Sequence, residues 1–149
     1  MRLESFKAID YVLADILPGR GFEDWGLSSG VVAMLRYMED ANTFWTVRDD
    51  EGTVLLIGGW HRVWNGVCEV SIFPTTHFIK RPVGVLLRLK KVLKALLRGH
   101  RRVQLNCRQE ERFVQFALRL GFQVEGTLRN FGHDGSDHIM MSLVGDSHA

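Results

Sequence analysis

Cysteine and proline are scarce in this chain, and long apolar runs are missing. Its 149 residues include two cysteines, Cys68 and Cys107, and three isolated prolines. Two cysteines form neither a disulfide framework nor a four-ligand zinc site, so both are expected to be buried, inert thiols. No apolar run approaches the roughly 20 residues of a membrane helix, and the lack of a Pro-rich linker favours a single domain over residues 1–149. The opening Met1–Ser5 lacks the apolar core of a secretory signal, so a cytoplasmic location is expected.

Acidic residues are missing from the middle of the chain. Residues 70–109 hold ten of the 19 Lys and Arg residues and no Asp or Glu, whereas the rest of the chain holds nine basic and 17 acidic residues. A polyanion would prefer this basic segment. It could serve a phosphate-rich cofactor, a nucleic acid or an acidic protein partner, or it could be the solvated face of one helix. Nucleic acid is the least favoured of these, because the sequence contains no helix-turn-helix or other reading module.

Apolar periodicity predicts two helices and then three strands in the first half. The first helix is predicted over residues 8–17, with apolar residues at 8, 9, 12, 13, 16 and 17 along one stripe, and the second over residues 31–38. Strands are predicted over residues 43–48, 53–60 and 67–73, separated by polar or Gly-containing turns. The residues before Ala8 leave room for one more short strand.

The second half alternates helices and strands. A long helix over residues 83–98 is predicted to bury Val85, Leu89, Val92 and Leu96 and to expose its basic residues. A strand over residues 101–107, a helix over residues 109–120, and strands over residues 122–131 and 138–144 follow. A mixed sheet covered by helices is the expected arrangement.

The last third of the chain carries a more specific pattern. Leu105-Asn106 ends a predicted strand, a helix closes on Arg119-Leu120-Gly121-Phe122, and Gln123-Val124-Glu125-Gly126-Thr127-Leu128-Arg129 follows. Gly121 suits the left-handed residue that stops a helix, and Gly126 suits a bend or a close approach. Residues 102–143 resemble the C-terminal half of the GNAT superfamily of N-acetyltransferases, with the LGF-x-x-EG-x-x-R ending of those that acetylate protein N-termini.

This resemblance implies a fold and a reaction. The fold would be of the α/β (α+β mixed) class, with a GNAT-like central mixed, mostly antiparallel sheet and helices on both faces. The reaction would move an acetyl group from acetyl-CoA to an amine, either of a small molecule or of a protein N-terminus, with no metal and no membrane partner.

The resemblance also implies where acetyl-CoA binds. In the family, the pyrophosphate lies on backbone amides at the start of the helix after the fourth strand, within a Q/R-x-x-G-x-G/A loop. Arg81 and Gly84 match that loop, while Leu86 replaces its small last residue. The residues assigned to acetyl-CoA on this basis are Phe73, Lys80, Arg81, Val83, Gly84, Val85 and Asn106. An ordinary helix start with Pro82 in its first turn explains the same residues.

Glu69 is the predicted catalytic residue. It is the single acid of the predicted strand 67–73, where family members often place the base that takes a proton from the amine. The alternative is an exposed strand residue without a role. The tyrosine that often serves as general acid aligns with Ala117, and Glu110 stands at the position of a family asparagine.

These departures keep a second hypothesis open. A GNAT-like domain without activity could serve as a structural or interaction protein in an assembly. This combination resembles small GNAT-like proteins encoded by tailed bacteriophages, some of them associated with the virion. The location would then be the host cytoplasm or the virion.

Overall fold

The computed structural model describes residues 1–17, 20–21, 30–78 and 82–145. Within these residues, one seven-stranded sheet has the order β1-β2-β3-β4-β5-β7-β6. The pairs β1–β2, β2–β3, β5–β7 and β6–β7 are antiparallel, and β4–β5 is parallel. The predicted mixed, mostly antiparallel sheet is therefore confirmed. The strands are β1 (Arg2–Ser5), β2 (Phe44–Arg48), β3 (Val54–Trp64), β4 (Val67–Pro74), β5 (Arg102–Arg108), β6 (Gln123–Leu128) and β7 (His138–Val144), and the helices are α1 (Ala8–Leu13), α2 (Val31–Ala41), α3 (Pro82–Gly99) and α4 (Glu111–Arg119).

The contacts divide the chain into two compact units. The first comprises Met1–Trp60 and Ser71–Val85, and the second comprises His61–Val70 and Leu86–Ala149. The chain passes from one unit to the other within β3, β4 and α3. The single domain over residues 1–149 stays a prediction.

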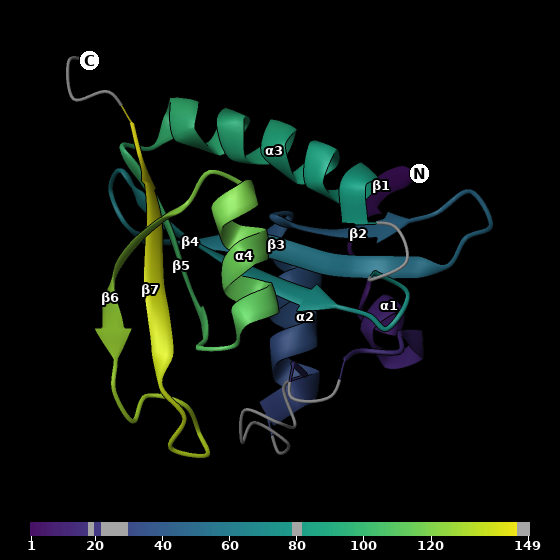
Figure 1. Ribbon diagram of the computed structural model, residues 1–149. Helices are drawn as coiled ribbons and strands as arrows, with labels where there is room; N and C mark the ends of the chain where they lie inside the picture. Colours follow the sequence, from purple (N-terminus) through teal and green to yellow (C-terminus); the bar gives the residue numbers. More distant parts are fainter. Residues whose placement is uncertain (18–19, 22–29, 79–81, 146–149) are drawn as a thin grey trace. The chain divides into compact units, whose positions relative to one another are not determined.

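The core of the first unit lies between its helices and one face of its strands. Tyr11 of α1 contacts Phe73 of β4 edge-on, with ring centroids 5.9 Å apart. The cluster comprises Phe6, Tyr11, Leu35, Met38, Phe44, Ile57 and Phe73. Val47 and Leu56 point to the opposite face and are equally buried, so both faces of β2 and β3 are covered. Figure 1 shows α1 and α2 beside these strands.

The prediction for the first helix is wrong in both its end and its buried face. α1 ends at Leu13, Ala14 is extended, and Ile16 forms an isolated bridge with Thr75. Ile9, Val12 and Leu13 are exposed, whereas Asp10 and Tyr11 are buried. Asp10 accepts hydrogen bonds from Arg48 and Thr46 of β2, which turns this polar residue inward and the predicted apolar stripe outward.

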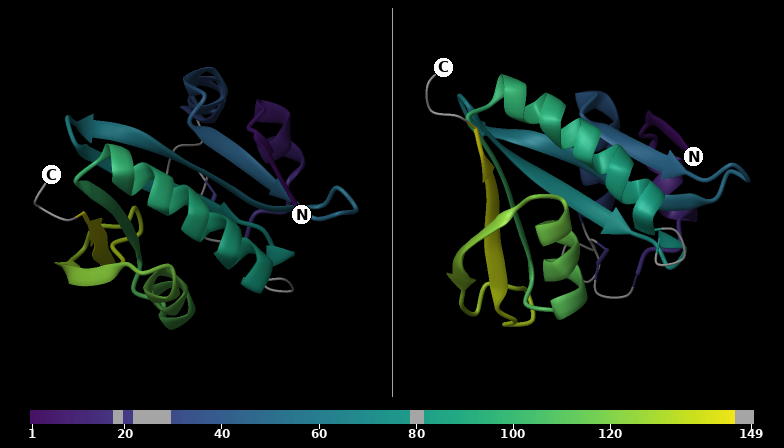
Figure 2. Two further views of the ribbon diagram at one scale, coloured as in Figure 1. Left: turned by 90° about the horizontal axis from the view of Figure 1, so that it is seen from above. Right: turned by 45° about the horizontal axis from the view of Figure 1, so that its top comes forward.

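The second unit is built on β5 and its neighbours. β5 pairs with β4 on one side and β7 on the other, and β6 pairs with β7. The views in Figure 2 show β5, β7 and β6 side by side, with α4 close to β5. Val103 and Leu105 of β5 are buried on one face, while Arg102, Gln104 and Asn106 alternate onto the other. This second face is polar.

The predicted amphipathic character of α3 is confirmed, with one change in the residues that are buried. Its buried residues are Val85, Leu89, Leu93 and Leu96, so Leu93 takes the place predicted for Val92. Spacings of four, four and three residues follow one face of a helix with 3.6 residues per turn. The basic residues Arg88, Lys91, Lys94 and Arg98 are exposed, as predicted.

The remaining local predictions concern two glycines and two cysteines. Gly121 ends α4 with φ +103°, as predicted. A Cβ on Gly126 would meet open space, so the prediction of a close approach at this glycine is wrong. The alternative prediction of a bend agrees with the register shift of β6 between Val124 and Gly126. Cys68 is fully buried, and burial raises its pKa to about 11, as expected for an inert thiol. Cys107 is only half-buried, because it lies near the end of β5.

Adding a side chain at Gly59 is expected to cause a measurable packing defect. A Cβ on Gly59 would lie 2.1 Å from Cδ1 of the buried Phe44 ring on the neighbouring strand. Gly59→Ala is therefore expected to lower the free energy of unfolding by about 1–3 kcal/mol through overpacking. Urea denaturation measures this loss, with Gly126→Ala as the matched control in open space. Equal stability of the two variants would contradict the prediction.

Candidate functional site

Glu69 lies in β4 where this strand pairs with β5. The parallel ladder places Val67 beside Arg102, Cys68 beside Val103 and Glu69 beside Gln104. Because side chains alternate along a strand, Cys68 points to the buried apolar face and Glu69 to the polar face. The Glu69 side chain is 25% exposed, so it is half-buried yet accessible. The catalytic role of Glu69 stays a prediction.

The two carboxylate oxygens of Glu69 have different surroundings. Gln104 donates a hydrogen bond from Nε2 to Oε1 of Glu69 at 3.2 Å. Oε2 faces the ring of His61, whose Nε2 lies 3.6 Å away and whose side chain is 39% exposed. One oxygen is therefore fixed by an amide, and the other faces a partly exposed imidazole.

A second carboxylate, Glu125, lies on the same polar face. Arg102 donates two hydrogen bonds to it, from Nη1 at 2.8 Å and from Nη2 at 2.5 Å, and Ser142 donates a third at 2.9 Å. The bonds from Arg102 and Ser142 lower the pKa of Glu125 to about 2. Arg102 also donates from Nε to Oε1 of Gln104 at 2.8 Å, which links Glu125 to the surroundings of Glu69.

The lowered pKa of Glu125 predicts an acid-sensitive contribution to stability. Its ordinary pKa is 4.5 and its folded value is about 2. A depressed folded pKa stabilises the protein above the unfolded pKa, and this stabilisation is lost as the pH falls from about 4.5 to about 2. Urea denaturation should show wild type more stable than Glu125→Gln at neutral pH, with the difference shrinking across that window. A difference independent of pH would contradict this.

Asn106 is on the same face as Gln104, two residues further along β5. His138 of β7 approaches it, with Nδ1 of His138 2.8 Å from Oδ1 of Asn106. Nearby, Ser136, which donates a backbone hydrogen bond, and Arg108, whose guanidinium lies 2.9 Å away, hold the pKa of Asp134 well below its usual range. The predicted role of Asn106 toward acetyl-CoA stays a prediction, with its amide oxygen already near an imidazole.

The residues assigned to acetyl-CoA occupy different environments. Lys80 and Arg81 lie outside the described residues. Phe73 and Val85 are buried in the core, so only their backbone atoms could reach a ligand, while Val83 is exposed at the start of α3. A Cβ on Gly84 would lie 2.7 Å from Cε of Met1, the flexible end of a side chain. The first turn of α3 has no acidic residue, which is compatible with an anion.

Ala117, which aligns with the family tyrosine by resemblance, is a buried residue of α4. Glu110 is the residue that precedes the first turn of α4 and pairs with Arg112. In the part of the chain that the structure describes, no three His, Cys, Asp or Glu side chains gather as metal ligands would. None of its described helices is both long and apolar enough to cross a membrane.

Sequence reasoning selected Glu69 but missed its neighbours. Gln104, Arg102, Glu125 and Ser142 come together through the registers of β4, β5 and β7 and through the irregular register of β6 near Glu125. The alternation of polar residues at 102, 104 and 106 with apolar residues between them was the available signal.

Comparisons with known proteins identify the fold. No family model matches the sequence, and no curated protein matches it. Among solved structures, a Salmonella typhimurium protein described as an acetyltransferase with its cofactor acetyl-CoA is similar over 99% of this chain and 95% of its own, with a TM-score of 0.73 and 15% identity.

Two further solved structures are similar to this chain over nearly their whole length. A GNAT-family acetyltransferase from Bacillus anthracis matches over 97% of this chain and 95% of its own, with a TM-score of 0.68 and 14% identity. A ribosomal-protein-alanine N-acetyltransferase from Brucella melitensis matches over 97% and 99%, with a TM-score of 0.70 and 14% identity. The chain therefore has the fold of the GNAT acetyltransferases.

Proposed function

We propose that this GNAT-fold chain is an acyl-CoA-dependent N-acetyltransferase that moves the acetyl group of acetyl-CoA directly to an amine. The observation that carries the proposal is Glu69, a half-buried carboxylate with one oxygen held by Gln104 and the other facing the partly exposed ring of His61. A carboxylate held in this way suits the removal of a proton from an amine. The likeness to a structure solved with acetyl-CoA supports the cosubstrate.

The reaction needs one base and one source of a proton. Glu69 takes a proton from the ammonium group of the acceptor, whose nitrogen then attacks the thioester carbon. The new carbon–nitrogen bond forms as the carbon–sulfur bond breaks, CoA leaves as its thiolate, and the second proton that the acceptor nitrogen loses passes to water. Because Ala117 has no proton to give, the thiolate takes its proton from water.

The start of α3 is the proposed site for the pyrophosphate of acetyl-CoA. The amides of Val83 and Gly84 lie in the first turn of an 18-residue helix, where backbone N–H groups lack helical partners and the helix dipole favours an anion. Lys80 and Arg81 would add positive charge there. Phe73 and Val85 would contribute backbone atoms.

A thermal-shift titration tests the cosubstrate. Acetyl-CoA at 100 times its Kd should stabilise the protein by about 2.7 kcal/mol, which raises Tm by roughly 5–10 °C for a chain of this size. Gly84→Trp should abolish the shift, whereas Gly99→Trp, at the open far end of the same helix, should retain it. Equal shifts with inorganic polyphosphate, or none with acetyl-CoA, would contradict the proposal.

The acceptor is a primary amine, and a protein N-terminus is the class to test first. This choice rests on the resemblance to the LGF-x-x-EG-x-x-R ending and on the fold likeness to a ribosomal-protein-alanine N-acetyltransferase. Peptides with free and blocked N-termini, incubated with acetyl-CoA and examined by mass spectrometry, separate this class from lysine side chains and small amines. The alternative of an inactive domain rests on the departures at Leu86 and Ala117.

A further inference from the structure

Five polar side chains of the second unit form a continuous chain of hydrogen bonds. Ser142 donates to Glu125, Arg102 donates to Glu125 and to Gln104, and Gln104 donates to Glu69. These residues come from β7, β6, β5 and β4, so the chain crosses one face of the sheet. It ends on the carboxylate proposed as the base.

The donors and acceptors allow one orientation of the Gln104 amide. A guanidinium group has donors and no acceptor, so Arg102 requires the oxygen of Gln104 on its side. The NH₂ group of Gln104 is thereby turned toward Glu69, which accepts when ionised. A reversed amide would place NH₂ against the guanidinium and oxygen against the carboxylate, losing both bonds.

Arg102 is itself held in place. Its two Nη atoms bind the two oxygens of Glu125, a planar arrangement that fixes the guanidinium more tightly than a single contact. Glu125 stays ionised at any pH where an ordinary glutamate titrates, because its pKa is about 2. The orientation of Gln104 is therefore constant over the working pH range.

We infer that Gln104 and Arg102 are positioning residues that hold Oε1 of Glu69 and leave Oε2 as the oxygen that takes the substrate's proton. Oε2 is the oxygen that faces the partly exposed His61. The N–H bond of the acceptor ammonium breaks, the proton binds Oε2, and it passes from there to water. This inference deepens the proposed function and rests on it.

A spectroscopic measurement tests the inference without requiring activity. Gln104→Met keeps the size of the side chain but removes the hydrogen bond that Gln104 donates to Glu69, so the carboxyl-carbon NMR signal of Glu69 should move. Gln115→Met, the same change on the exposed side of α4, should leave that signal unchanged. Carboxyl-carbon NMR of the full chain measures both variants, and circular dichroism confirms folding.

Kinetics provide the second measurement. In Gln104→Met, kcat should fall about tenfold because the carboxylate is less well placed, whereas KM for acetyl-CoA should not change. A merely structural role for Gln104 would lower stability without this separation of kcat from KM.

The outcomes separate the two proposals. A wild-type chain that neither binds acetyl-CoA nor transfers its acetyl group overturns the proposed function, whatever the NMR spectra show. An active wild type whose Gln104→Met variant retains both the Glu69 carboxyl signal and the wild-type kcat overturns this inference alone. A moved signal together with a lower kcat at unchanged KM supports it.

Discussion

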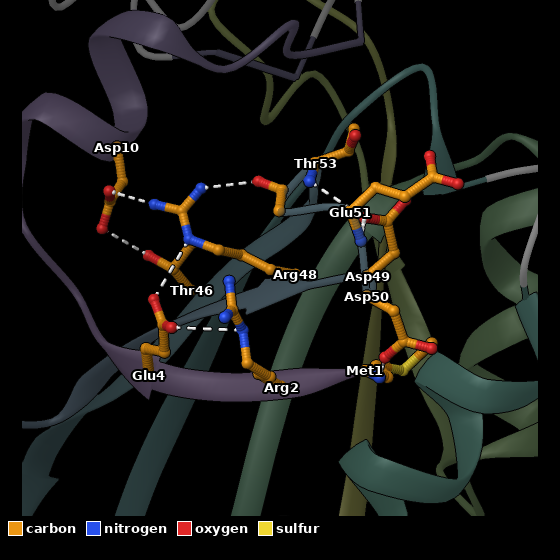
Figure 3. A network of polar contacts seen from close by, with 11 residues as sticks. Met1, Arg2, Glu4, Asp10, Thr46, Arg48, Asp49, Asp50, Glu51 and Thr53 are labelled. Carbon is orange, nitrogen blue, oxygen red and sulfur yellow. Dashed lines mark hydrogen bonds and ion pairs between the residues drawn. The ribbon is translucent and has the colours of Figure 1, made fainter.

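Replacing Asp10 with alanine is expected to lower the free energy of unfolding by about 3 kcal/mol, because the change leaves a buried polar cluster without its acceptor. Asp10 accepts hydrogen bonds from Nη2 of Arg48 at 2.6 Å, from Oγ1 of Thr46 at 2.8 Å and from the backbone N–H of Lys7 at 2.9 Å. Figure 3 shows its carboxylate between α1 and the strand that carries Thr46 and Arg48. Thr46 is fully buried, so its hydroxyl would find no water in the variant.

A neighbouring acid provides the control for this prediction. Glu4 accepts a hydrogen bond from Nε of the same arginine, Arg48, at 3.1 Å, but its side chain is 43% exposed. Glu4→Ala should therefore cost about 1 kcal/mol or less. Urea denaturation of wild type and both variants compares the two acids directly. If Asp10→Ala lowers the free energy of unfolding no more than Glu4→Ala does, the burial of Asp10 does not determine its contribution to stability.

The elements that were predicted correctly are those whose signals lie within a few neighbouring residues of the sequence. The last strand was predicted over residues 138–144 and is found over the same range as β7, since a mostly apolar run follows the polar turn of residues 132–137. The end of α4 at Gly121 was predictable for the same reason, because a left-handed residue needs no distant partner.

α1 shows why periodicity failed elsewhere. Its apolar residues predicted a buried stripe, but the face that is buried contains Asp10. The partners that make this burial favourable, Thr46 and Arg48, lie more than 30 residues away along the chain. No local sequence pattern indicates that these distant residues are partners of Asp10. The buried face of α1 therefore could not be predicted from the residues of the helix alone.

The candidate site was predictable to the same limited extent. Glu69 stood out as the single acid of its strand, a property visible in the sequence. The residues that orient it depend on strand register, which pairs Glu69 with Gln104 and Gln104 with Ser142. Glu125 joins them at the register shift of β6. Register and bulges are set by the assembled sheet.

Glu69→Gln is expected to lower kcat/KM for acetyl transfer by about 10²- to 10⁴-fold, the usual contribution of a positioned general base. The amide keeps the size of the carboxylate but cannot take a proton, and its oxygen can still accept the bond from Gln104. Folding and the acetyl-CoA thermal shift should therefore be preserved. Release of the CoA thiol, followed with an acceptor that wild type acetylates, measures the loss.

The pH dependence of this variant separates lost proton transfer from lost binding. Without a base, the reaction depends on acceptor that is already neutral, so the residual rate should rise with pH through the acceptor's own pKa, about 7.7–8.0 for a peptide N-terminus. Glu111→Gln, the same substitution on exposed α4, should keep the wild-type rate and profile. A Glu69→Gln rate within threefold of wild type at neutral pH, or a deficit of equal size at every pH, would mean that Glu69 is not the base. The proton would then leave the acceptor by another route, and the hydrogen bonds that end on Glu69 would serve the sheet alone.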